Sequence, residues 1–270
     1  MASHRKLRAA AVVCAVAVLT GPAPVAAWAA TGGAPAAAPT AVAPSPDPFA
    51  GLTADQIGDR AVTATQSATS LRMTGRLVTG GQPLDIDFAV DDHDECTGTM
   101  RVGGGTAELR KLDGITYLKG DGAFWRTSMT SQGMPPAQID ATIELVKGRW
   151  LKITPGQQGS ADLGGVCDLK GLLADLGKGG AERQGLTRGP DAVVGGTPVA
   201  TLVKKNPGGG TTTVSVSREG RPYILKTVKT GGAEPGTLVL SAYDQPVKVV
   251  VPPASETVDL AKLGQGGTSA

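Results

Sequence analysis

Histidine is almost absent from this chain. Its 270 residues include two histidines, His4 and His93, and three cysteines. His4 falls in an N-terminal segment that we expect to be removed, so a Ser-His-Asp or Cys-His mechanism would have to use His93. A zinc site normally takes several His or Cys ligands. The residue inventory therefore argues against an enzyme, and we expect no catalytic residue, no metal site and no cofactor.

Aromatic residues and clustered positive charge are also scarce. Phe, Trp and Tyr make up 3% of the chain, and no dense Lys/Arg patch with interleaved aromatic residues occurs in the sequence. Nucleic-acid binding is therefore not expected. Beyond the first 30 residues, no apolar run approaches the about 20 residues that a membrane-spanning helix needs. We expect the mature chain to be soluble.

The first 30 residues have the pattern of a secretory signal peptide. A basic start at residues 4–8 precedes an apolar stretch at 9–19, which is too short to span a bilayer, and small residues at 27–29 suit cleavage. Cys14 follows two valines instead of a small residue, so we do not expect a lipid anchor there. The protein is predicted to be secreted, to the cell envelope or beyond it.

Composition divides the rest of the chain into three parts. Residues 31–48 are rich in Ala and Pro and have no large side chain, which predicts a disordered tether. Residues 264–270 predict a flexible tail for the same reason. Residues 49–263 remain and are expected to form a single domain. The full chain has 26 basic and 24 acidic residues, and loss of Arg5, Lys6 and Arg8 with the signal peptide leaves a net charge of −1.

Two cysteines, Cys96 and Cys167, remain after removal of the signal peptide. In an exported protein, two cysteines most simply form one disulfide. Two separate buried thiols are the alternative. The disulfide would close a long loop and stabilise the fold by roughly 4 kcal/mol in the chain-entropy treatment.

Hydrophobic periodicity predicts a chain that is mostly strands. Residues 49–67 are expected to form a helix, because Thr53 and Gln56 fit a capping box and apolar residues follow at helical spacing. The segments 71–77 and 84–90 alternate apolar and polar residues, as half-buried antiparallel strands do. Further strands separated by Gly-rich turns are predicted at 96–102, 107–112, 114–120, 122–128, 149–153, 196–205, 211–217, 221–230, 236–244 and 246–253.

Two more helices interrupt this series, at 135–148 and 168–180. The count is about ten strands and three helices. The fold class is therefore α+β, with one long, curved, mostly antiparallel sheet and the helices gathered on one face.

The acidic run Asp91, Asp92, His93, Asp94 and Glu95 precedes Cys96. We interpret it first as the solvated turn of a hairpin between strands 84–90 and 96–102. A calcium site is an alternative, because carboxylates are hard oxygen donors, but the spaced Asp/Asn pattern of a calcium loop is missing. A catalytic cluster is the third and weakest interpretation.

One face of the predicted sheet is continuously apolar. A protein core is the default use of such a face, but the predicted helices are few and short for so long a sheet. A curved sheet with helices on its open side can also enclose an apolar cavity. Spacing alone does not decide between cavity and solid core. The residues on this face are Leu71, Met73, Leu77, Leu84, Ile86, Phe88, Met100, Val102 and Leu109.

Several segments resemble the LppX/LprG-type (LppX_LprAFG) envelope lipoproteins of actinobacteria, which are similar to the LolA-like half-barrel superfamily. They are "LRMTGRL", the hairpin "DGITYLKGDGAFW", "RWLKI", and the closing run "LSAYDQPVKVVVPP", which resembles the family's terminal strand. The resemblance covers about residues 52–261. It implies a half-barrel whose concave face takes a diacyl or triacyl lipid without catalysis.

The sequence departs from this family at two places. Many members carry a lipid anchor on an N-terminal cysteine, and no usable site for one is present here. The pair Cys96 and Cys167 could pin the sheet to the helical region from Asp168 and narrow the cavity. Membrane attachment and cavity size are therefore both open.

We predict a non-enzymatic envelope protein that binds or transports a lipid or other hydrophobic ligand, with the helix at 139–146 as a lid. An envelope sensor or interaction module that binds a protein partner is the alternative. The protein is expected to be a monomer, and peripheral membrane association stays open. The residues predicted to contact the ligand are Leu71, Met73, Leu84, Ile86, Phe88, Met100, Leu109, Ile139 and Ile143.

Overall fold

The computed structural model of the chain describes residues 46–157, 165–178, 184–207, 209–259 and 262. The predicted signal peptide, the predicted tail and nearly all of the predicted tether lie outside these residues. Ser45–Ala270 forms one compact unit, and it is described here by itself. Ordered contacts begin at the end of the predicted tether, because Asp47 accepts a hydrogen bond from the amide of Phe49 (3.0 Å) and pairs with Arg188 (2.7 Å).

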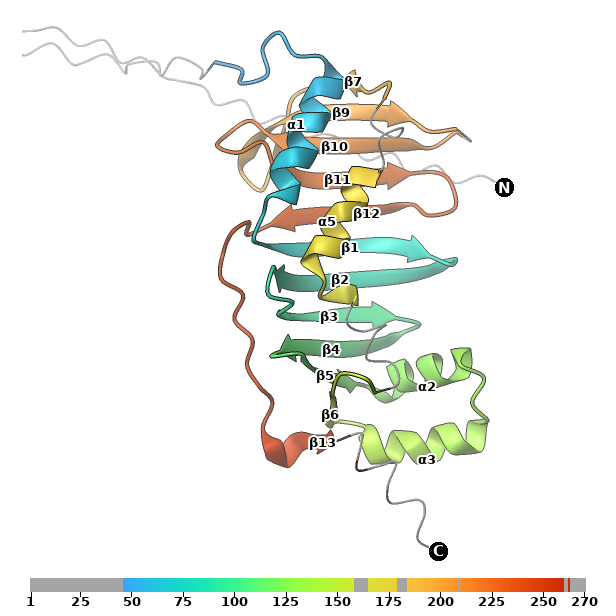
Figure 1. Cartoon of the computed structure of the whole chain (residues 1–270). Helices are drawn as coiled ribbons and strands as arrows, with labels where there is room; N and C mark the ends of the chain where they lie inside the picture. The colour runs from blue at the N-terminus through green and yellow to red at the C-terminus, as the bar shows by residue number, and fades with distance from the viewer. Residues whose placement is uncertain (1–45, 158–164, 179–183, 208, 260–261, 263–270) are drawn as a thin grey trace, which may run out of the picture. The chain divides into compact units, whose positions relative to one another are not determined.

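A single mostly antiparallel sheet dominates the described residues (Figure 1). It has 13 strands in the order β13-β6-β5-β4-β3-β2-β1-β12-β11-β10-β9-β7, and β8 pairs with β9. The sheet is curved and open, which confirms the predicted α+β half-barrel. Its strands are β1 (Ser70–Thr79), β2 (Gln82–Asp91), β3 (Cys96–Val102), β4 (Gly105–Leu112), β5 (Ile115–Gly120), β6 (Trp150–Ile153), β7 (Thr187–Arg188), β8 (Ala192–Val194), β9 (Thr197–Lys205), β10 (Thr211–Ser217), β11 (Ile224–Thr230), β12 (Gly236–Ser241) and β13 (Thr257–Asp259).

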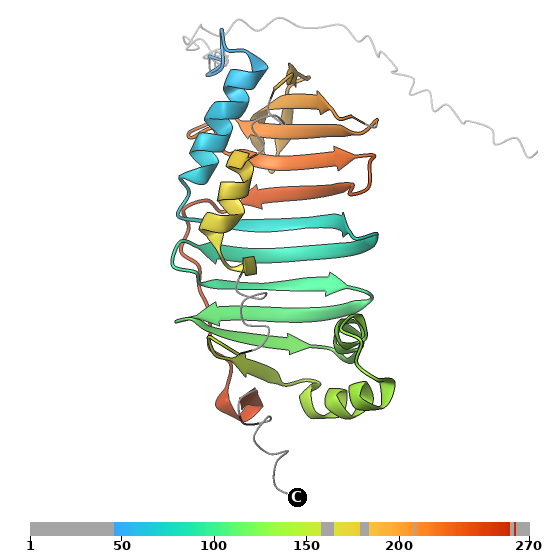
Figure 2. The same cartoon turned by 45° about the vertical axis from the view of Figure 1, so that its right-hand side comes forward.

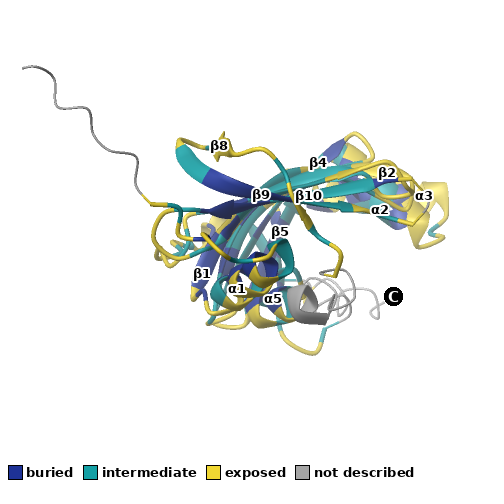
Figure 3. Ribbon diagram, turned by 90° about the horizontal axis from the view of Figure 1, so that it is seen from above, coloured by how far each residue is buried: buried dark blue, intermediate teal, exposed yellow. Residues whose placement is uncertain are grey.

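The helices lie in two groups along the sheet. α1 (Ala54–Gln66) and α5 (Leu169–Lys178) contact each other, and α1 packs on β10 and β11 (Figure 2). α2 (Gly122–Ser131) and α3 (Pro136–Val146) contact each other near the opposite end, where α2 packs on β4 and β5. In the view from above, buried residues gather where α1 and α5 face the sheet (Figure 3). None of the helices among the described residues is long and apolar enough to span a membrane.

Strand register confirms the alternation of the two N-terminal strands. Met73 lies opposite Phe88, and Leu77 opposite Leu84, so the apolar side chains of β1 and β2 share the concave face. The convex face of the same pair carries charge: Arg76 lies opposite Asp85, and their side chains are 2.7 Å apart. Alternation with a period of two therefore separates an apolar concave face from a solvated convex one.

The capping box predicted for the first helix is confirmed. The hydroxyl of Thr53 accepts a hydrogen bond from the amide of Gln56 (3.2 Å), and the side chain of Gln56 accepts one from the amide of Thr53 (2.9 Å). Asp113-Gly114 forms a tight turn between β4 and β5, at the break between the predicted strands 107–112 and 114–120. Both residues have positive φ, 51° and 74°, as the mirror-image turns of two-residue hairpins require.

The predicted strand at 122–128 is wrong, because these residues form α2. Asp121 caps this helix: its Oδ1 accepts a hydrogen bond from the amide of Phe124 (2.7 Å), and its Oδ2 accepts one from the amide of Thr106 in β4 (2.9 Å). The helix start also packs directly on Gly105, where an added Cβ would lie 2.0 Å from the amide nitrogen of Phe124. Gly-Asp-Gly at 120–122 is thus a helix N-cap and not a hairpin turn.

The predicted strand at 246–253 is also wrong. After β12 the chain runs in an extended conformation along the ends of the strands, then forms a short 3-10 helix, η2 (Ala254–Glu256), before β13 (Figure 1). Pro246, Pro252 and Pro253 have no amide proton to donate to a ladder. Half-buried and exposed residues still alternate over 246–250. One side of this segment contacts the domain and the other side faces solvent, so its apolar and polar residues alternate as in a strand although the segment pairs with no strand. Three short strands of two or three residues, β7, β8 and β13, were not predicted.

Candidate ligand-binding site

A cavity of about 580 Å³ lies between α1 and the concave side of β9, β10 and β11. Its volume falls within the range of about 300–1,000 Å³ that small-molecule sites occupy. α1 forms one wall, and the hairpin segments after β9 and β11 form the rim. The cavity residues used below are Gly58, Ala61, Val62, Leu202, Lys204, Asn206, Thr212, Val214, Ile224, Thr227, Lys229, Gly231 and Gly232.

The floor of the cavity is apolar. Ala61 of α1, Leu202 of β9 and Ile224 of β11 are buried, and Val62 and Val214 are half-buried beside them. These residues offer no charged group to a bound molecule. The floor is therefore suited to a hydrocarbon surface.

Hydrogen bonds at both ends of α1 fix this wall in place. Near the first turn, Asp55 Oδ1 accepts a hydrogen bond from the amide of Leu186 (2.9 Å). Near the last turn, the buried hydroxyl of Thr65 accepts one from the amide of Ile224 (3.1 Å). Between them, Gly58 lets the helix approach Leu186, where an added Cβ would lie 2.9 Å from a side-chain carbon. The cavity wall is thus preorganised by the fold.

The rim of the cavity is cationic and polar. Lys204 of β9, Thr212 of β10 and Lys229 of β11 lie in register on three adjacent strands. Asn206 donates a hydrogen bond to the hydroxyl of Thr212 (2.9 Å). Lys204 is half-buried and Lys229 is exposed, so the positive charge lies between the floor and the solvent.

A row of half-buried residues continues from the cavity along the concave face of the sheet. Thr227, which lines the cavity, lies opposite Leu238 of β12, and Leu238 lies opposite Gly75 of β1. Gly75 in turn lies opposite Ile86, and Ile86 opposite Met100. Leu238, Ile86 and Met100 are all half-buried. One cross-strand row of the concave face therefore joins the cavity to residues that were predicted from the sequence.

The nine predicted contact residues fall into two sets, and none of them lines the 580 Å³ cavity. Met73, Leu84, Ile86 and Met100 are half-buried on the concave face, in or beside this row. The other five are buried in the hydrophobic core: Leu71 (2% exposed), Phe88 (2%), Leu109 (0%), Ile139 (2%) and Ile143 (6%). Contact between these nine residues and a ligand stays a prediction.

The cavity wall comes from elements that the sequence analysis did not consider for binding. The helix predicted as a lid is α3, which packs against α2, whereas α1 covers the cavity. The signal that could have found the floor is the alternation in 211–217, which places Val214 on the apolar face opposite Leu202. In 197–205 both faces are buried from Val199 to Leu202, so alternation is less regular there than in 84–90.

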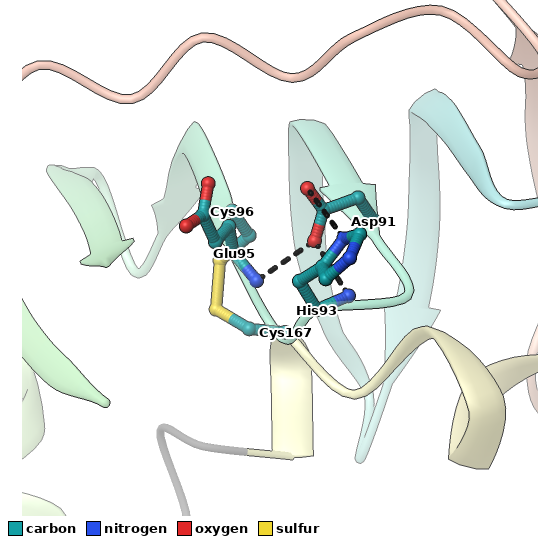
Figure 4. The surroundings of a disulfide bond; sticks show 5 residues. All are labelled: Asp91, His93, Glu95, Cys96 and Cys167. Carbon is teal, nitrogen blue, oxygen red and sulfur yellow. Dashed lines mark hydrogen bonds and ion pairs between the residues drawn. A yellow bond between two sulfur atoms is a disulfide. The ribbon is translucent and has the colours of Figure 1, made fainter. Parts of the chain in front are cut away.

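The predicted disulfide is confirmed. Cys96 and Cys167 are bonded with their Cα atoms 5.4 Å apart, and both are fully buried. Cys96 lies opposite Val90, on the side of the sheet that carries the core. The bond therefore ties the segment that precedes α5 to the concave face, 71 residues away in sequence (Figure 4).

The acidic run before Cys96 forms the β2–β3 turn, as predicted. Asp91 Oδ1 accepts hydrogen bonds from the amides of His93 and Glu95, both at 3.0 Å (Figure 4). His93 lies 3.1 Å from Asp92, and its side chain is 79% exposed. Across the part of the chain that the structure describes, no group of three or more His, Cys, Asp or Glu residues is placed to hold a metal ion.

A tyrosine-aspartate cluster anchors the end of α1 behind the cavity. The rings of Tyr223 and Tyr243 stack with centroids 4.0 Å apart, and the Tyr243 hydroxyl donates a hydrogen bond to the carbonyl of Ile224. Burial raises the pKa of Tyr243. Asp244 accepts hydrogen bonds from the Tyr223 hydroxyl (2.5 Å) and from the Thr69 amide (2.9 Å), which hold the pKa of Asp244 below its usual value.

Known proteins match this chain in fold but not in sequence. No protein-family model matches it, and no curated protein matches it. The structure is similar to that of LprF from Mycobacterium bovis, with a TM-score of 0.50 and 14% identity over 74% of this chain and 97% of LprF. LppX, a lipoprotein of Mycobacterium tuberculosis, gives a TM-score of 0.43 and 13% identity over 73% of this chain and 97% of LppX.

A third similar structure is the MucA/MucB complex of Pseudomonas aeruginosa, with a TM-score of 0.30 and 12% identity over 75% of this chain and 59% of the matched chain. Of these three likenesses, the one to LprF supports the fold, and at 14% identity it shows the fold alone. It confirms the resemblance to LppX/LprG-type proteins at the level of the half-barrel.

Proposed function

We propose that this chain is an exported protein of the cell envelope that holds a lipid or other hydrophobic ligand in its half-barrel and catalyses no reaction. The observation that carries the proposal is the cavity of about 580 Å³ with a buried apolar floor. The half-buried row through Leu238, Ile86 and Met100 lies on the same face of the sheet as the cavity. A ligand longer than the cavity would lie along that row and contact the half-buried residues predicted from the sequence.

Export is supported by two features of the chain. Residues 1–30 have the pattern of a signal peptide, and the disulfide between Cys96 and Cys167 suits an oxidising compartment. In this proposal residues 31–48 connect the signal peptide to one ligand-binding domain at 49–263, and the mature protein acts as a monomer.

The absence of catalysis is proposed from the residue inventory. His93 is the single histidine outside the predicted signal peptide, and it is exposed in a turn. Among the described residues, the rim of the cavity supplies ammonium, amide and hydroxyl groups and no carboxylate or imidazole. These groups can bind and orient a molecule, and we assign them that role.

The proposal is tested by native mass spectrometry of the chain purified from its own host, followed by organic extraction. We expect a co-purifying hydrophobic molecule at a ratio near one to one. Val62→Trp would fill the cavity from α1 and should abolish co-purification, whereas Thr63→Trp, on the exposed side of the same helix, should not. Equal occupancy in both variants would refute binding in this cavity. A clean apo mass for the unmodified chain would favour the protein-interaction alternative.

A further inference from the structure

The space between α1 and the sheet has room for one long hydrocarbon chain and not for two. Its volume is about 580 Å³. A methylene group takes about the same room as a water molecule in the liquid, about 30 Å³, so the cavity holds about 19 such groups. One straight acyl chain of about 16–18 carbons would therefore fill it, and two such chains would need about twice the volume.

The walls of the cavity are linked in a way that opposes widening. The hydrogen bonds of Asp55 and Thr65 fix both ends of α1. A third bond joins α1 to α5, because the side-chain amide of Gln66 donates to the carbonyl of Leu173 (3.1 Å). The disulfide in turn ties the segment before α5 to the sheet. Making room for a second acyl chain would require some of these links to break.

The concave face next to the cavity is occupied by packed side chains. Leu71 of β1, Phe88 of β2 and Leu240 of β12 are buried in one hydrophobic cluster with Leu169 and Leu173 of α5. Beyond the cavity, a second acyl chain could therefore lie only on the half-buried row of the concave face. Carbons on that row stay partly in water and gain less from burial.

The entrance of the cavity is polar and open. Gly231 and Gly232 line it with positive φ, 70° and 75°, and both are exposed, so no side chain covers the entrance at these two positions. Beside them, Asn206 donates a hydrogen bond to Thr212 (2.9 Å). A polar head group at one end of the acyl chain can therefore remain in water while the chain lies on the apolar floor.

We propose that the ligand is a single-chain amphiphile, with one unbranched acyl chain of about 16–18 carbons in the cavity and its polar head group at the rim. This inference rests on the proposed function, since it names the class of ligand in the same cavity. It departs from the diacyl or triacyl lipid that the sequence resemblance implies. A free fatty acid and a monoacyl lipid share the proposed chemistry.

The first test counts fatty acyl chains on the protein purified from its own host. Acid methanolysis converts all bound acyl chains to methyl esters, which are quantified against protein. We expect one acyl chain for each protein molecule. Mild alkaline methanolysis converts esters but not free acids, so the same sample distinguishes a monoacyl lipid from a free fatty acid.

The outcomes separate this inference from the proposed function. Two or three acyl chains for each protein molecule, or a bound molecule without an acyl chain, would overturn the single-chain ligand and leave a hydrophobic carrier. The absence of any bound hydrophobic molecule would count against the carrier itself.

The second test measures affinity for saturated monoacylglycerols of increasing chain length, after the bound lipid has been removed. The affinity for the free monomer should rise about fourfold with each added carbon up to about 18 carbons, and by less than about twofold beyond that limit. 1,2-Dipalmitoylglycerol should bind no more tightly than 1-palmitoylglycerol, because its second chain stays outside the cavity. Tighter binding of the two-chain lipid, by tenfold or more, would contradict the volume argument.

A substitution on the floor should shift this limit. Val214→Phe takes the room of about two methylene groups, so the limit should move to an acyl chain about two carbons shorter. Thr213→Phe is the matched control on the other face of β10, where its neighbours in register are Val203 and Val228. The control should leave the limit unchanged. If Val214→Phe melts as the unmodified protein does and the limit does not move, the acyl chain does not lie in this cavity.

Discussion

Loss of the disulfide should destabilise this protein strongly. The double substitution Cys96→Ala and Cys167→Ala opens a loop of 71 residues that the bond closes in the unfolded chain. In the chain-entropy treatment, a loop of this length corresponds to about 4 kcal/mol of stability. Both cysteines are fully buried, so alanine adds a small packing loss.

The assay is thermal unfolding followed by circular dichroism. For a domain of about 150–250 residues, 1 kcal/mol corresponds to about 2–4 °C in Tm, so we expect the double variant to melt about 8–16 °C lower. A reducing agent should lower the Tm of the unmodified protein to a similar value. The same agent should leave the Tm of the double variant unchanged, which controls for effects unrelated to the disulfide.

The position of the bond predicts a second effect on the same variant. The disulfide holds the segment before α5 on the concave face, and α5 contacts α1, which forms the cavity wall. If the proposed hydrophobic ligand binds in this cavity, its affinity should therefore fall together with the Tm. If the double variant melts within about 2 °C of the unmodified protein, the disulfide does not stabilise the fold by restricting the unfolded chain.

Three further substitutions probe the elements around the cavity. Thr65→Val removes the buried hydroxyl that accepts a β11 amide and should lower the free energy of unfolding by about 1–3 kcal/mol in urea titrations, whereas Thr65→Ser should retain most of it. The pKa of Asp244 is depressed in the folded protein, and this stabilises the fold above about pH 4. The contribution is lost as pH falls through the folded-state pKa. The Tm of Asp244→Asn should therefore decline less steeply with acidification than the Tm of the unmodified protein. Gly105→Ala should lower the free energy of unfolding by about 1–3 kcal/mol in the same titrations, because the added Cβ would meet the backbone of Phe124. Gly104→Ala is the comparison: an added Cβ meets no other atom there, so this variant reports the backbone strain of a positive φ alone.

The sequence predicted the architecture well where a single local signal decides the structure. Period-two alternation in 71–77 and 84–90 correctly assigned both strands and the face that each side chain occupies. The capping box at Thr53 correctly began the first helix. The prediction failed at Asp121, where one Asp-Gly pair fits both a hairpin turn and a helix cap. The close approach between Gly105 and Phe124, which favours the cap, joins residues that no local window contains.

The site was harder to predict than the fold, because core and binding surface have the same pattern. Leu202 and Phe88 both alternate onto the concave face, yet Leu202 lines the cavity and Phe88 is covered. The difference depends on which helix lies above each strand. That placement is set by contacts between distant segments, such as Asp55 with Leu186 and Cys96 with Cys167.

The same reasoning explains how this fold can combine stability with an accessible apolar surface. The concave face is largely apolar, because the sheet forms one core with its helices. Hydrogen bonds at both ends of α1 hold this helix over β10 and β11 without filling the space beneath it. The cavity is thus a consequence of how α1 is anchored, and it can coexist with a well-packed core elsewhere on the same sheet.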